Sequence, residues 1–288
     1  MSFPTSFPPQ HQDQHPGLEY AMIPFPIYDN DSYLTRGTLL QDKVAIITGG
    51  DSGIGKAVAL AFAKQGANIV IAYYNEKKDA QTVRDIIEAV QRECLVIQAD
   101  LSLETECQRV ISETINHFNK LDILVNNAAV QYEAQKLELI SEEQFDKTFK
   151  TNVYGTFHMT KAALPHLKSG CSIINTTSVV AFHGNETLID YSMTKGALVA
   201  FTRSLATSLA KSKSGIRVNA VAPGPIWTPL IPSSFSEEKV SKFGANTPMG
   251  RAGQPVECAG AYVFLASDAA SYITGQTIHI NGGEIVNA

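Results

Sequence analysis

Tyr191 and Lys195 stand four residues apart, in the run YSMTK at the start of a long stretch with helical periodicity. A spacing of i, i+4 places both side chains on one face of a helix. A phenol can act as general acid or base at neutral pH only if its pKa of about 10 falls by roughly 3 units. A neighbouring ammonium group favours the phenolate by charge attraction. The pair therefore predicts proton transfer by Tyr191, assisted by Lys195.

Ser178 stands thirteen residues before Tyr191, just after the apolar run SIINTT (172–177). Its hydroxyl would hold a substrate oxygen and stabilise the charge that develops there when a hydride moves to or from the adjacent carbon. Taken alone, a tyrosine and a lysine at this spacing more often mark a solvent-exposed helix face. The prediction of catalysis therefore depends on further motifs along the chain.

A glycine-rich turn, TGGDSGIG (48–55), follows the first apolar run and leads directly into the helical run KAVALAFAKQG. We expect Gly49 to allow the tight turn, Gly53 to let the backbone approach a pyrophosphate, and Gly55 to let helix and strand pack closely. The N–H groups and the positive dipole end of the following helix attract phosphate. Between a first strand and a first helix, this turn predicts dinucleotide binding rather than a turn used only for packing.

The elements that must position these residues are visible from Lys43 onward, where short β-branched runs alternate with longer stretches of helical periodicity. Such uniformly apolar strands are buried on both faces, and right-handed crossovers place helices on both sides of a parallel sheet. We predict an α/β fold, a doubly wound, mostly parallel sheet of seven strands in one domain, residues 41–288. The expected strands are 44–48, 68–74, 95–99, 122–126, 172–177, 217–222 and 277–280, and the expected helices about 53–65, 77–92, 103–118, 141–168 and 191–212.

The glycine spacing TGxxxGxG is one residue longer than GxGxxG, and three further motifs accompany it: NNAA (126–129), Asp100 in ADL, and the turn Pro223-Gly224. Together they resemble the short-chain dehydrogenase/reductase family over about residues 41–288, with Ala129 in place of the glycine of the family's NNAG motif. The resemblance implies a Rossmann-type fold and an NAD(P) cofactor. Asx turns alone would also explain the two asparagines. The residues it assigns to the cofactor are Gly49, Asp51, Ser52, Gly53, Ile54, Gly55, Asp100, Leu101, Asn126, Ala128, Tyr191, Lys195, Pro223, Gly224, Ile226 and Thr228.

The same resemblance assigns a catalytic tetrad of Asn152, Ser178, Tyr191 and Lys195. Asn152 matches the family's asparagine that holds a water on a proton path to the lysine, and Lys195 would also bond the nicotinamide ribose. In oxidation, Tyr191 would take the hydroxyl proton while the carbinol hydride passes to the nicotinamide, and reduction would reverse both steps. This implies an oxidoreductase for a secondary alcohol or carbonyl compound, with no metal. The alternative is a dinucleotide-binding sensor or scaffold with negligible turnover, which would not need all four residues.

The residues expected near the adenosine ribose give a mixed indication of the cofactor. A carboxylate there holds the 2′-hydroxyl of NAD, whereas a basic side chain pairs with the 2′-phosphate of NADP. The second strand ends without an acid, but Glu76, Lys77 and Lys78 follow it closely. Asp51 in the glycine turn would repel a 2′-phosphate, so we expect a weak preference for NAD. Glu76 and the two lysines are also typical of an exposed, charged helix start.

Residues beside the tetrad and after the Pro223-Gly224 turn are expected to shape the substrate pocket. The candidates are Val179, Val180, His183, Ile189, Pro225 and Trp227. His183 is equally compatible with a surface loop, and Trp227 either lines the pocket or packs. The proline-bounded stretch 225–250 predicts a short helix on a mobile lid, or else a fixed surface excursion. Polyol, sugar, steroid, ketoacyl and xenobiotic carbonyl substrates all stay open, although the resemblance is closest to sugar and polyol dehydrogenases.

Residues 1–40 differ in composition from the rest of the chain, since six of the 13 prolines lie there among Gln, His and Ser. Four acids precede Arg36, so most of the formal charge of −5 lies in this segment. Proline restricts φ and lacks an N–H donor, so we expect an extension, not a domain, that runs extended over a surface or is disordered. A solvated tail and an arm on a neighbouring subunit are both compatible with it.

Composition excludes several classes of protein. With 44% hydrophobic residues in 288, the chain can bury a sizeable core, and a net charge of −5 is the wrong sign for a general nucleic-acid or anionic-membrane binder. No apolar run reaches the length of a membrane span, and the start lacks the layout of a signal peptide, so we expect a cytoplasmic protein with a small-molecule substrate. The four cysteines, far apart and without metal-ligand spacing, are expected to be buried thiols.

The family resemblance also implies a homo-oligomer, a tetramer, with the C-terminal segment TIHI (277–280) commonly at a subunit interface. The expected helix 191–212 has a second apolar face formed by Leu198, Phe201, Leu205 and Leu209. That face packs either on the core or on a partner subunit.

Overall fold

The computed structural model describes residues 3–30 and 35–285. Seven parallel strands form one sheet in the order β3-β2-β1-β4-β5-β6-β7. They are β1 (Val44–Thr48), β2 (Asn68–Tyr73), β3 (Cys94–Gln98), β4 (Ile123–Asn126), β5 (Ser172–Thr176), β6 (Arg217–Pro223) and β7 (Thr277–Ile280). The predicted seven-stranded, doubly wound sheet is confirmed, and each strand begins and ends within one residue of its expected range.

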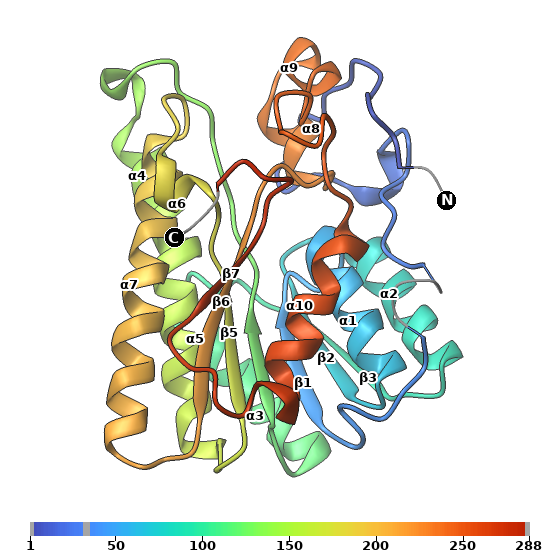
Figure 1. The fold of residues 1–288 in the computed structure, drawn as a ribbon, viewed down its shortest axis with the longest axis vertical. Helices are drawn as coiled ribbons and strands as arrows, with labels where there is room; N and C mark the ends of the chain where they lie inside the picture. The colour runs from blue at the N-terminus through green and yellow to red at the C-terminus, as the bar shows by residue number, and fades with distance from the viewer. Residues whose placement is uncertain (1–2, 31–34, 286–288) are drawn as a thin grey trace.

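Helices cover both faces of the sheet (Figure 1). The helices α1 (Gly53–Lys64), α2 (Lys77–Ala89) and α10 (Pro255–Ala266) pack on one face, and α3 (Glu104–Phe118), α5 (Gly155–Ala163) and α7 (Ile189–Lys211) pack on the other. In β1, Ala45 and Ile47 face the first layer, whereas Val44 and Ile46 face the second. All of β1 and β5 is buried, because both faces of the sheet are covered.

The expected helix 141–168 is divided into several pieces. It consists of α4 (Glu142–Phe149), a π-helical turn (Lys150–Tyr154), α5 and a 3-10 turn (Leu164–His166). Ser141 caps α4 by accepting a hydrogen bond from the Gln144 N–H at 3.1 Å. A π turn inserts an extra residue into the helix and is frequent at functional sites. This one contains Asn152.

The helix α10 was not among the expected elements, although its start carries recognisable signals. Pro255 opens the helix, and Gln254 and Glu257 form a reciprocal capping box. The helix is apolar nearly all round, because it packs on the sheet and beside α1. An apolar run without amphipathic periodicity is hard to assign from sequence alone.

Residues 3–30, called the N-terminal arm below, run over the surface of their own chain beside α8 (Leu230–Ser234) and α2 (Figure 1). Phe7 stacks on Trp227 with ring centroids 3.9 Å apart. Further along the arm, the Ile27 N–H donates to Gln254 at 2.8 Å, and Asp29 pairs with Lys64 at 2.6 Å. The arm therefore follows the extended path that its prolines predicted, on its own subunit, and residues 3–30 are not a solvated tail.

Three further observations concern the cysteine thiols, membrane-spanning helices and metal ligands. Cys94, Cys107, Cys171 and Cys258 are all buried free thiols, as predicted. Over the described ranges 3–30 and 35–285, no helix has both the length and the apolar character needed to cross a bilayer. Within the same ranges, no cluster of three or more His, Cys, Asp or Glu side chains is arranged to hold a metal.

Candidate active site

A cavity of about 880 Å³ lies at the carboxyl ends of the strands. This is the edge at which an open parallel sheet binds its ligands, because the loops between strand and helix diverge there. Gly55 and Asn126 support its wall from behind, while the other residues assigned to the cofactor line it. These are Gly49, Asp51, Ser52, Gly53, Ile54, Asp100, Leu101, Ala128, Tyr191, Lys195, Pro223, Gly224, Ile226 and Thr228.

The glycine turn is packed too closely for side chains at its key positions. A Cβ on Gly55 would lie 2.0 Å from the Gly49 carbonyl oxygen, and Gly49 and Gly53 have φ of +60° and +51°. The Asn127 amide donates to the Thr48 and Gly49 carbonyls at 3.1 and 3.2 Å. The NNAA motif therefore holds the turn against β4, through long-range hydrogen bonds donated by the Asn127 side chain rather than through a local Asx turn.

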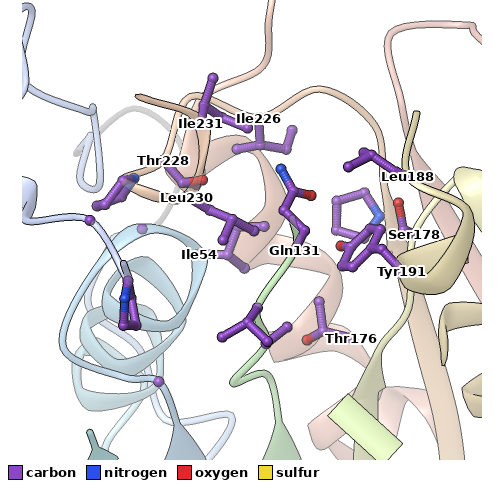
Figure 2. A pocket seen from close by; sticks show the side chains of 18 of the residues that line it. Ile54, Gln131, Thr176, Ser178, Leu188, Tyr191, Ile226, Thr228, Leu230 and Ile231 are labelled. Carbon is purple, nitrogen blue, oxygen red and sulfur yellow. The ribbon is translucent and has the colours of Figure 1, made fainter. Parts of the chain in front are cut away.

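Tyr191 and Ser178 meet in the cavity, where Figure 2 shows the phenol and the serine side by side. Tyr191 is 8% exposed and Ser178 is 9% exposed. Burial raises the pKa of Tyr191, and the hydrogen bond with Ser178 opposes this only in part. The expectation that Lys195, together with the charged nicotinamide ring, favours the phenolate concerns the complex with oxidised cofactor and stays a prediction.

Lys195 lies beneath the phenol. Its Nζ is 5.4 Å from the centre of the Tyr191 ring and donates to the Thr176 carbonyl at 2.8 Å. Burial lowers the pKa of Lys195 to about 7. Burial thus favours the neutral forms of both the amine and the phenol in the protein without cofactor.

Asn152 lies behind the cavity wall and connects two catalytic segments. Its side-chain amide accepts from the Val130 N–H and donates to the Val130 carbonyl, both at 2.9 Å. It also donates to the Thr194 hydroxyl at 3.1 Å, and that hydroxyl donates to the Tyr191 carbonyl. Asn152 therefore ties the loop after β4 to the helix that carries Tyr191 and Lys195.

The opposite end of the cavity is acidic. Asp51 and Glu76 both line it and are 5% and 3% exposed. Burial, followed by the charge of Glu76, raises the pKa of Asp51 to about 7. Lys77 and Lys78 start α2 with exposed side chains, and the Lys78 ammonium lies 4.0 Å from the centre of the Tyr20 ring in the arm. The exposed helix start is thus confirmed for the two lysines, whereas Glu76 is buried.

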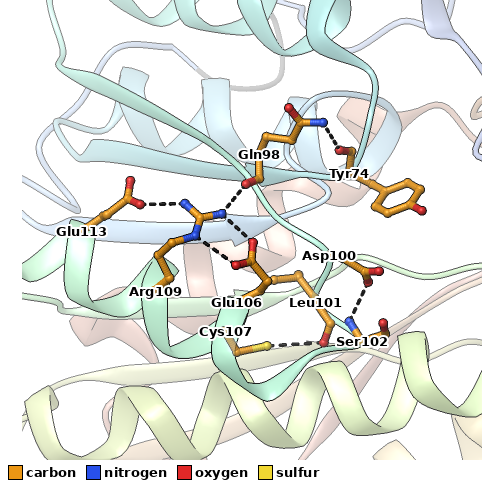
Figure 3. A network of polar contacts seen from close by, with 9 residues as sticks. All are labelled: Tyr74, Gln98, Asp100, Leu101, Ser102, Glu106, Cys107, Arg109 and Glu113. Carbon is orange, nitrogen blue, oxygen red and sulfur yellow. Dashed lines mark hydrogen bonds and ion pairs between the residues drawn. The ribbon is translucent and has the colours of Figure 1, made fainter.

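A polar network fixes the strand ends at this acidic side (Figure 3). Arg109 donates to the Gln98 carbonyl at 2.6 Å and pairs with Glu106 and Glu113. The Gln98 amide donates to the Tyr74 carbonyl at 2.9 Å, which joins the end of β3 to the end of β2. Nearby, Asp100 accepts from the Ser102 N–H at 3.0 Å and faces the cavity beside Leu101.

Of the predicted substrate residues, Val179, Val180, His183 and Pro225 line the cavity. His183, at the end of α6 (Val180–His183), lies 3.5 Å from Glu284 at the rim. Trp227 as a substrate residue is wrong. It is fully buried, stacks on Phe7 and donates its indole N–H to the Pro24 carbonyl at 2.9 Å, because the arm provides the apolar surface that covers it.

The stretch 225–250 forms two short helices, α8 and α9 (Glu237–Ser241), beside the mouth of the cavity. The arm is bound to this stretch. The Gln12 N–H donates to the Pro232 carbonyl at 2.8 Å, and His11 bonds the Phe235 carbonyl at 2.9 Å. A lid in this position would therefore move together with the arm or break these contacts.

Sequence reasoning missed two contributions to the site. The first comes from the arm, where His15, Pro16 and Gly17 line the cavity. Beside them, Glu19 accepts from the Gly53 N–H of the glycine turn at 2.8 Å and pairs with Lys56. The low-complexity composition of the arm gave no signal for this contact. The second comes from Gln131, which is buried. It lies in a loop, where the sequence has no periodicity that would indicate a buried side chain.

Comparisons with known proteins agree with this architecture. Residues 49–284 match the family described as enoyl-(acyl carrier protein) reductase. The chain is 59% identical to the uncharacterized oxidoreductase YhdF of Bacillus subtilis over 97% of this chain and 96% of that protein. It is 50% identical to NADPH-dependent aldehyde reductase 1, chloroplastic, of Arabidopsis thaliana, over 97% and 98%. It is 48% identical to glucose and ribitol dehydrogenase of Daucus carota, over the full length of both chains.

Solved structures show the same fold. A 3-ketoacyl-(acyl-carrier-protein) reductase from Brucella melitensis, complexed with NADH, superposes with a TM-score of 0.79 at 37% identity, over 86% of this chain and 100% of that one. A short chain dehydrogenase from Burkholderia cenocepacia, in complex with NADP, gives 0.80 at 30% identity, over 85% and 98%. With the glycine turn, the sheet order and the matched residues in agreement, the chain belongs to the short-chain dehydrogenase/reductase family of oxidoreductases.

Proposed function

We propose that this protein transfers a hydride between NAD(P) and a secondary alcohol or carbonyl substrate, with Tyr191 as general acid and base. The observation that carries the proposal is the position of Tyr191 and Ser178 inside a cavity of about 880 Å³ whose other end is the glycine turn. A cavity of this size accommodates a dinucleotide and a small substrate together. The catalytically weak sensor or scaffold is not favoured by any contact of the site.

The residues present fit a dinucleotide. The glycine turn leaves no room for side chains, and the cavity extends from it past Thr228 to Tyr191, so a molecule lying along the cavity reaches both ends. The N–H groups at the start of α1 would hold the phosphates, and Pro223, Gly224 and Ile226 would flank the nicotinamide. When bound, the nicotinamide ring supplies the hydride acceptor or donor, and its oxidised form is positively charged.

The protein's own groups handle the proton. The Ser178 hydroxyl donates a hydrogen bond to the substrate oxygen and stabilises the charge that develops on it. The Tyr191 phenol takes the proton of an alcohol or gives one to a carbonyl oxygen. Lys195, fixed by the Thr176 carbonyl, holds its amine below the phenol, where a positive charge on it lowers the cost of the phenolate.

We propose NAD as the weakly preferred cofactor. Asp51 and Glu76 line the acidic end of the cavity, whereas the Lys77 and Lys78 side chains are exposed on α2. Carboxylates accept hydrogen bonds from ribose hydroxyls and repel a 2′-phosphate. The Arabidopsis relative is named for NADPH, so both cofactors belong in the first assay.

The test is turnover followed by nicotinamide absorbance, with NAD and NADP against a panel of polyols, sugars and carbonyl compounds. Tyr191→Phe removes only the hydroxyl and is expected to lower kcat at least 100-fold while the cofactor still binds, since general acid–base catalysis typically contributes 10²–10⁴-fold. A Phe variant as active as the parent protein contradicts the proposed role of Tyr191. Cofactor binding without turnover on any substrate would favour the sensor.

The remaining expectations are also proposals. We propose a cytoplasmic protein with a small-molecule substrate. The net charge of −5 disfavours a nucleic-acid partner. A gel shift that disappears with added salt would contradict the last point. We also propose the homotetramer that the family resemblance implies.

A further inference from the structure

Gln131 places a polar group in the part of the cavity that holds Tyr191. The residue is 4% exposed and lines the cavity, and Figure 2 shows its carboxamide among Ile226, Leu230 and Tyr191. Its backbone carbonyl accepts from the Ser234 hydroxyl at 3.3 Å. In the described ranges 3–30 and 35–285, its side-chain amide makes no hydrogen bond, and Figure 2 shows it directed into the cavity.

The backbone that carries this side chain is held on both sides. Val130, directly before it, makes two hydrogen bonds of 2.9 Å with the amide of Asn152. Three residues later, the Ala134 N–H donates to the Thr187 carbonyl at 2.9 Å. Gln131 therefore lies in a fixed loop beside the cavity, and a side chain that recognises a ligand needs such a fixed position.

The walls around the carboxamide are mainly apolar. Ile54, Leu188, Ile226, Leu230 and Ile231 surround this part of the cavity, together with the hydroxyls of Tyr191 and Ser178. A substrate that enters displaces water from the Gln131 amide. Because an amide without a hydrogen-bond partner in an apolar site is costly, a substrate that supplies an oxygen is favoured over one that supplies only alkyl groups.

We propose that Gln131 determines substrate specificity by bonding a second oxygen of the substrate, a hydroxyl or carbonyl next to the reacting carbon. This inference rests on the proposed function, in which Tyr191 and Ser178 hold the reacting oxygen. A carboxamide both donates and accepts, so it suits a neutral hydroxyl or carbonyl better than a carboxylate or an amine. The favoured substrates are hydroxyketones, diketones and vicinal diols, including polyols, rather than simple alcohols and ketones.

The test uses two ketones that differ only in one hydroxyl, acetoin and 2-butanone, in the direction of reduction. The parent protein is expected to reduce acetoin with a kcat/KM at least about tenfold above that for 2-butanone. Gln131→Leu is expected to bring this ratio close to one by lowering the value for acetoin alone. Gln131→Asn keeps the carboxamide on a shorter side chain and should restore part of the ratio.

Two controls accompany the kinetics. Gln81→Leu makes the same chemical change at an exposed position of α2, where the Gln81 amide bonds only Asp85 in the described structure, and should leave the ratio unchanged. Calorimetry of each ketone with the complex of protein and ADP-ribose, which lacks the nicotinamide ring, gives dissociation constants without turnover. If the parent protein binds acetoin more tightly but reduces neither ketone, the proposed function fails and the role of Gln131 stands.

Three results would overturn the inference. The first is a parent protein that treats the two ketones alike. The second is a Gln131→Leu variant that loses the same factor for both. The third is a variant that binds the dinucleotide itself at least tenfold more weakly, which would place the carboxamide on the cofactor rather than on the substrate.

Discussion

At the scale of single residues, burial controls the charges of the site. Tyr191 and Lys195 are both buried, and the loss of hydration disfavours the phenolate and the ammonium alike. A spacing of four residues in the sequence predicted their proximity but not this effect, since proximity alone suggests mutual stabilisation of opposite charges. Asp51 is affected in the same way, because it shares a buried corner with Glu76.

The lowered pKa of Lys195 predicts a stability cost that depends on pH. The unfolded chain keeps this lysine protonated up to about pH 10.5, whereas the folded protein releases the proton at about 7, so the cost is largest below pH 7 and decreases above it. The free energy of unfolding of Lys195→Met should therefore exceed that of the parent by about a few kcal/mol at pH 7, and by less at pH 9. The variant should also lose turnover. Urea unfolding at both pH values checks this.

The control for that experiment is Lys211→Met at the exposed end of the same helix, which should show neither effect. A Lys195→Met protein that is less stable than the parent at pH 7 would mean that the hydrogen bond to the Thr176 carbonyl outweighs the cost of burying the amine.

The raised pKa of Asp51 predicts a cofactor preference that changes with pH. Above pH 7 the carboxylate is ionised and repels a 2′-phosphate, and below it the group is increasingly protonated and neutral. The ratio of kcat/KM for NAD over NADP should therefore fall by about tenfold or less from pH 8 to pH 6. Asp51→Asn should shift the ratio towards NADP at pH 8 and remove this pH dependence, while Asp85→Asn on the exposed side of α2 should not.

At the scale of elements, the arm is joined to α1 by a buried ion pair. Glu19 and Lys56 are 0% and 2% exposed, and the Lys56 ammonium also lies 3.9 Å from the centre of the Tyr28 ring. The carboxylate accepts from the Gly53 N–H as well, at the positive end of the helix dipole. The arm thus contributes to the stability of the very turn that would bind phosphate.

Removing one partner of this pair should destabilise the protein more than removing both. Glu19→Gln leaves the Lys56 charge buried and unpaired and is expected to cost about 3–5 kcal/mol of unfolding free energy. The double variant Glu19→Gln with Lys56→Met should recover part of that loss, since the unpaired Lys56 charge is removed while the nearby buried Asp79 loses the attraction of Lys56. Chemical denaturation of the four proteins of this cycle gives the coupling energy. Additive losses would show that the two side chains act independently.

At the scale of the whole molecule, four neighbouring helical segments carry exposed apolar side chains. Phe145, Tyr154, Phe157 and Met193, from α4, the π turn, α5 and α7, are 39%, 50%, 47% and 50% exposed. The rings of Phe157 on α5 and Phe201 on α7 are 6.4 Å apart. The other apolar residues of α7 face their own core, where Leu198 is buried and Leu205 and Leu209 pack.

The exposed side chains on these neighbouring segments predict self-association through α5 and α7, because exposed apolar groups that gather on a surface are typical of interfaces. Sedimentation of the parent protein at micromolar concentration should give the mass of a tetramer, and Phe157→Glu should shift it to a smaller species while the far-UV circular dichroism is kept. Leu39→Glu, at an exposed leucine elsewhere, is the control. A parent protein that sediments at 31.2 kDa contradicts the prediction.

The local patterns of the chain were enough to predict the sheet, the glycine turn and the positions of Ser178, Tyr191 and Lys195, because each depends on residues close together in sequence. Alternation of apolar runs and helical periodicity defines βαβ units, and a turn between strand and helix has its own spacing. The helix α10 was not predicted because it is apolar nearly all round. The break at Lys150–Tyr154 was not predicted because a π turn has no simple sequence pattern.

Contacts between distant segments could only be found in the tertiary structure. From sequence, Trp227 either lines the pocket or packs, and the structure shows it packed against the arm, whose Pro24 lies 203 residues away in sequence. The pKa values of Asp51, Tyr191 and Lys195 depend on burial by several elements at once. Whether the Gln131 amide finds a hydrogen-bond partner among the described residues depends on the loops around it. Local sequence determines the elements because backbone preferences and side-chain periodicity act over a few residues, whereas desolvation and packing depend on the complete fold.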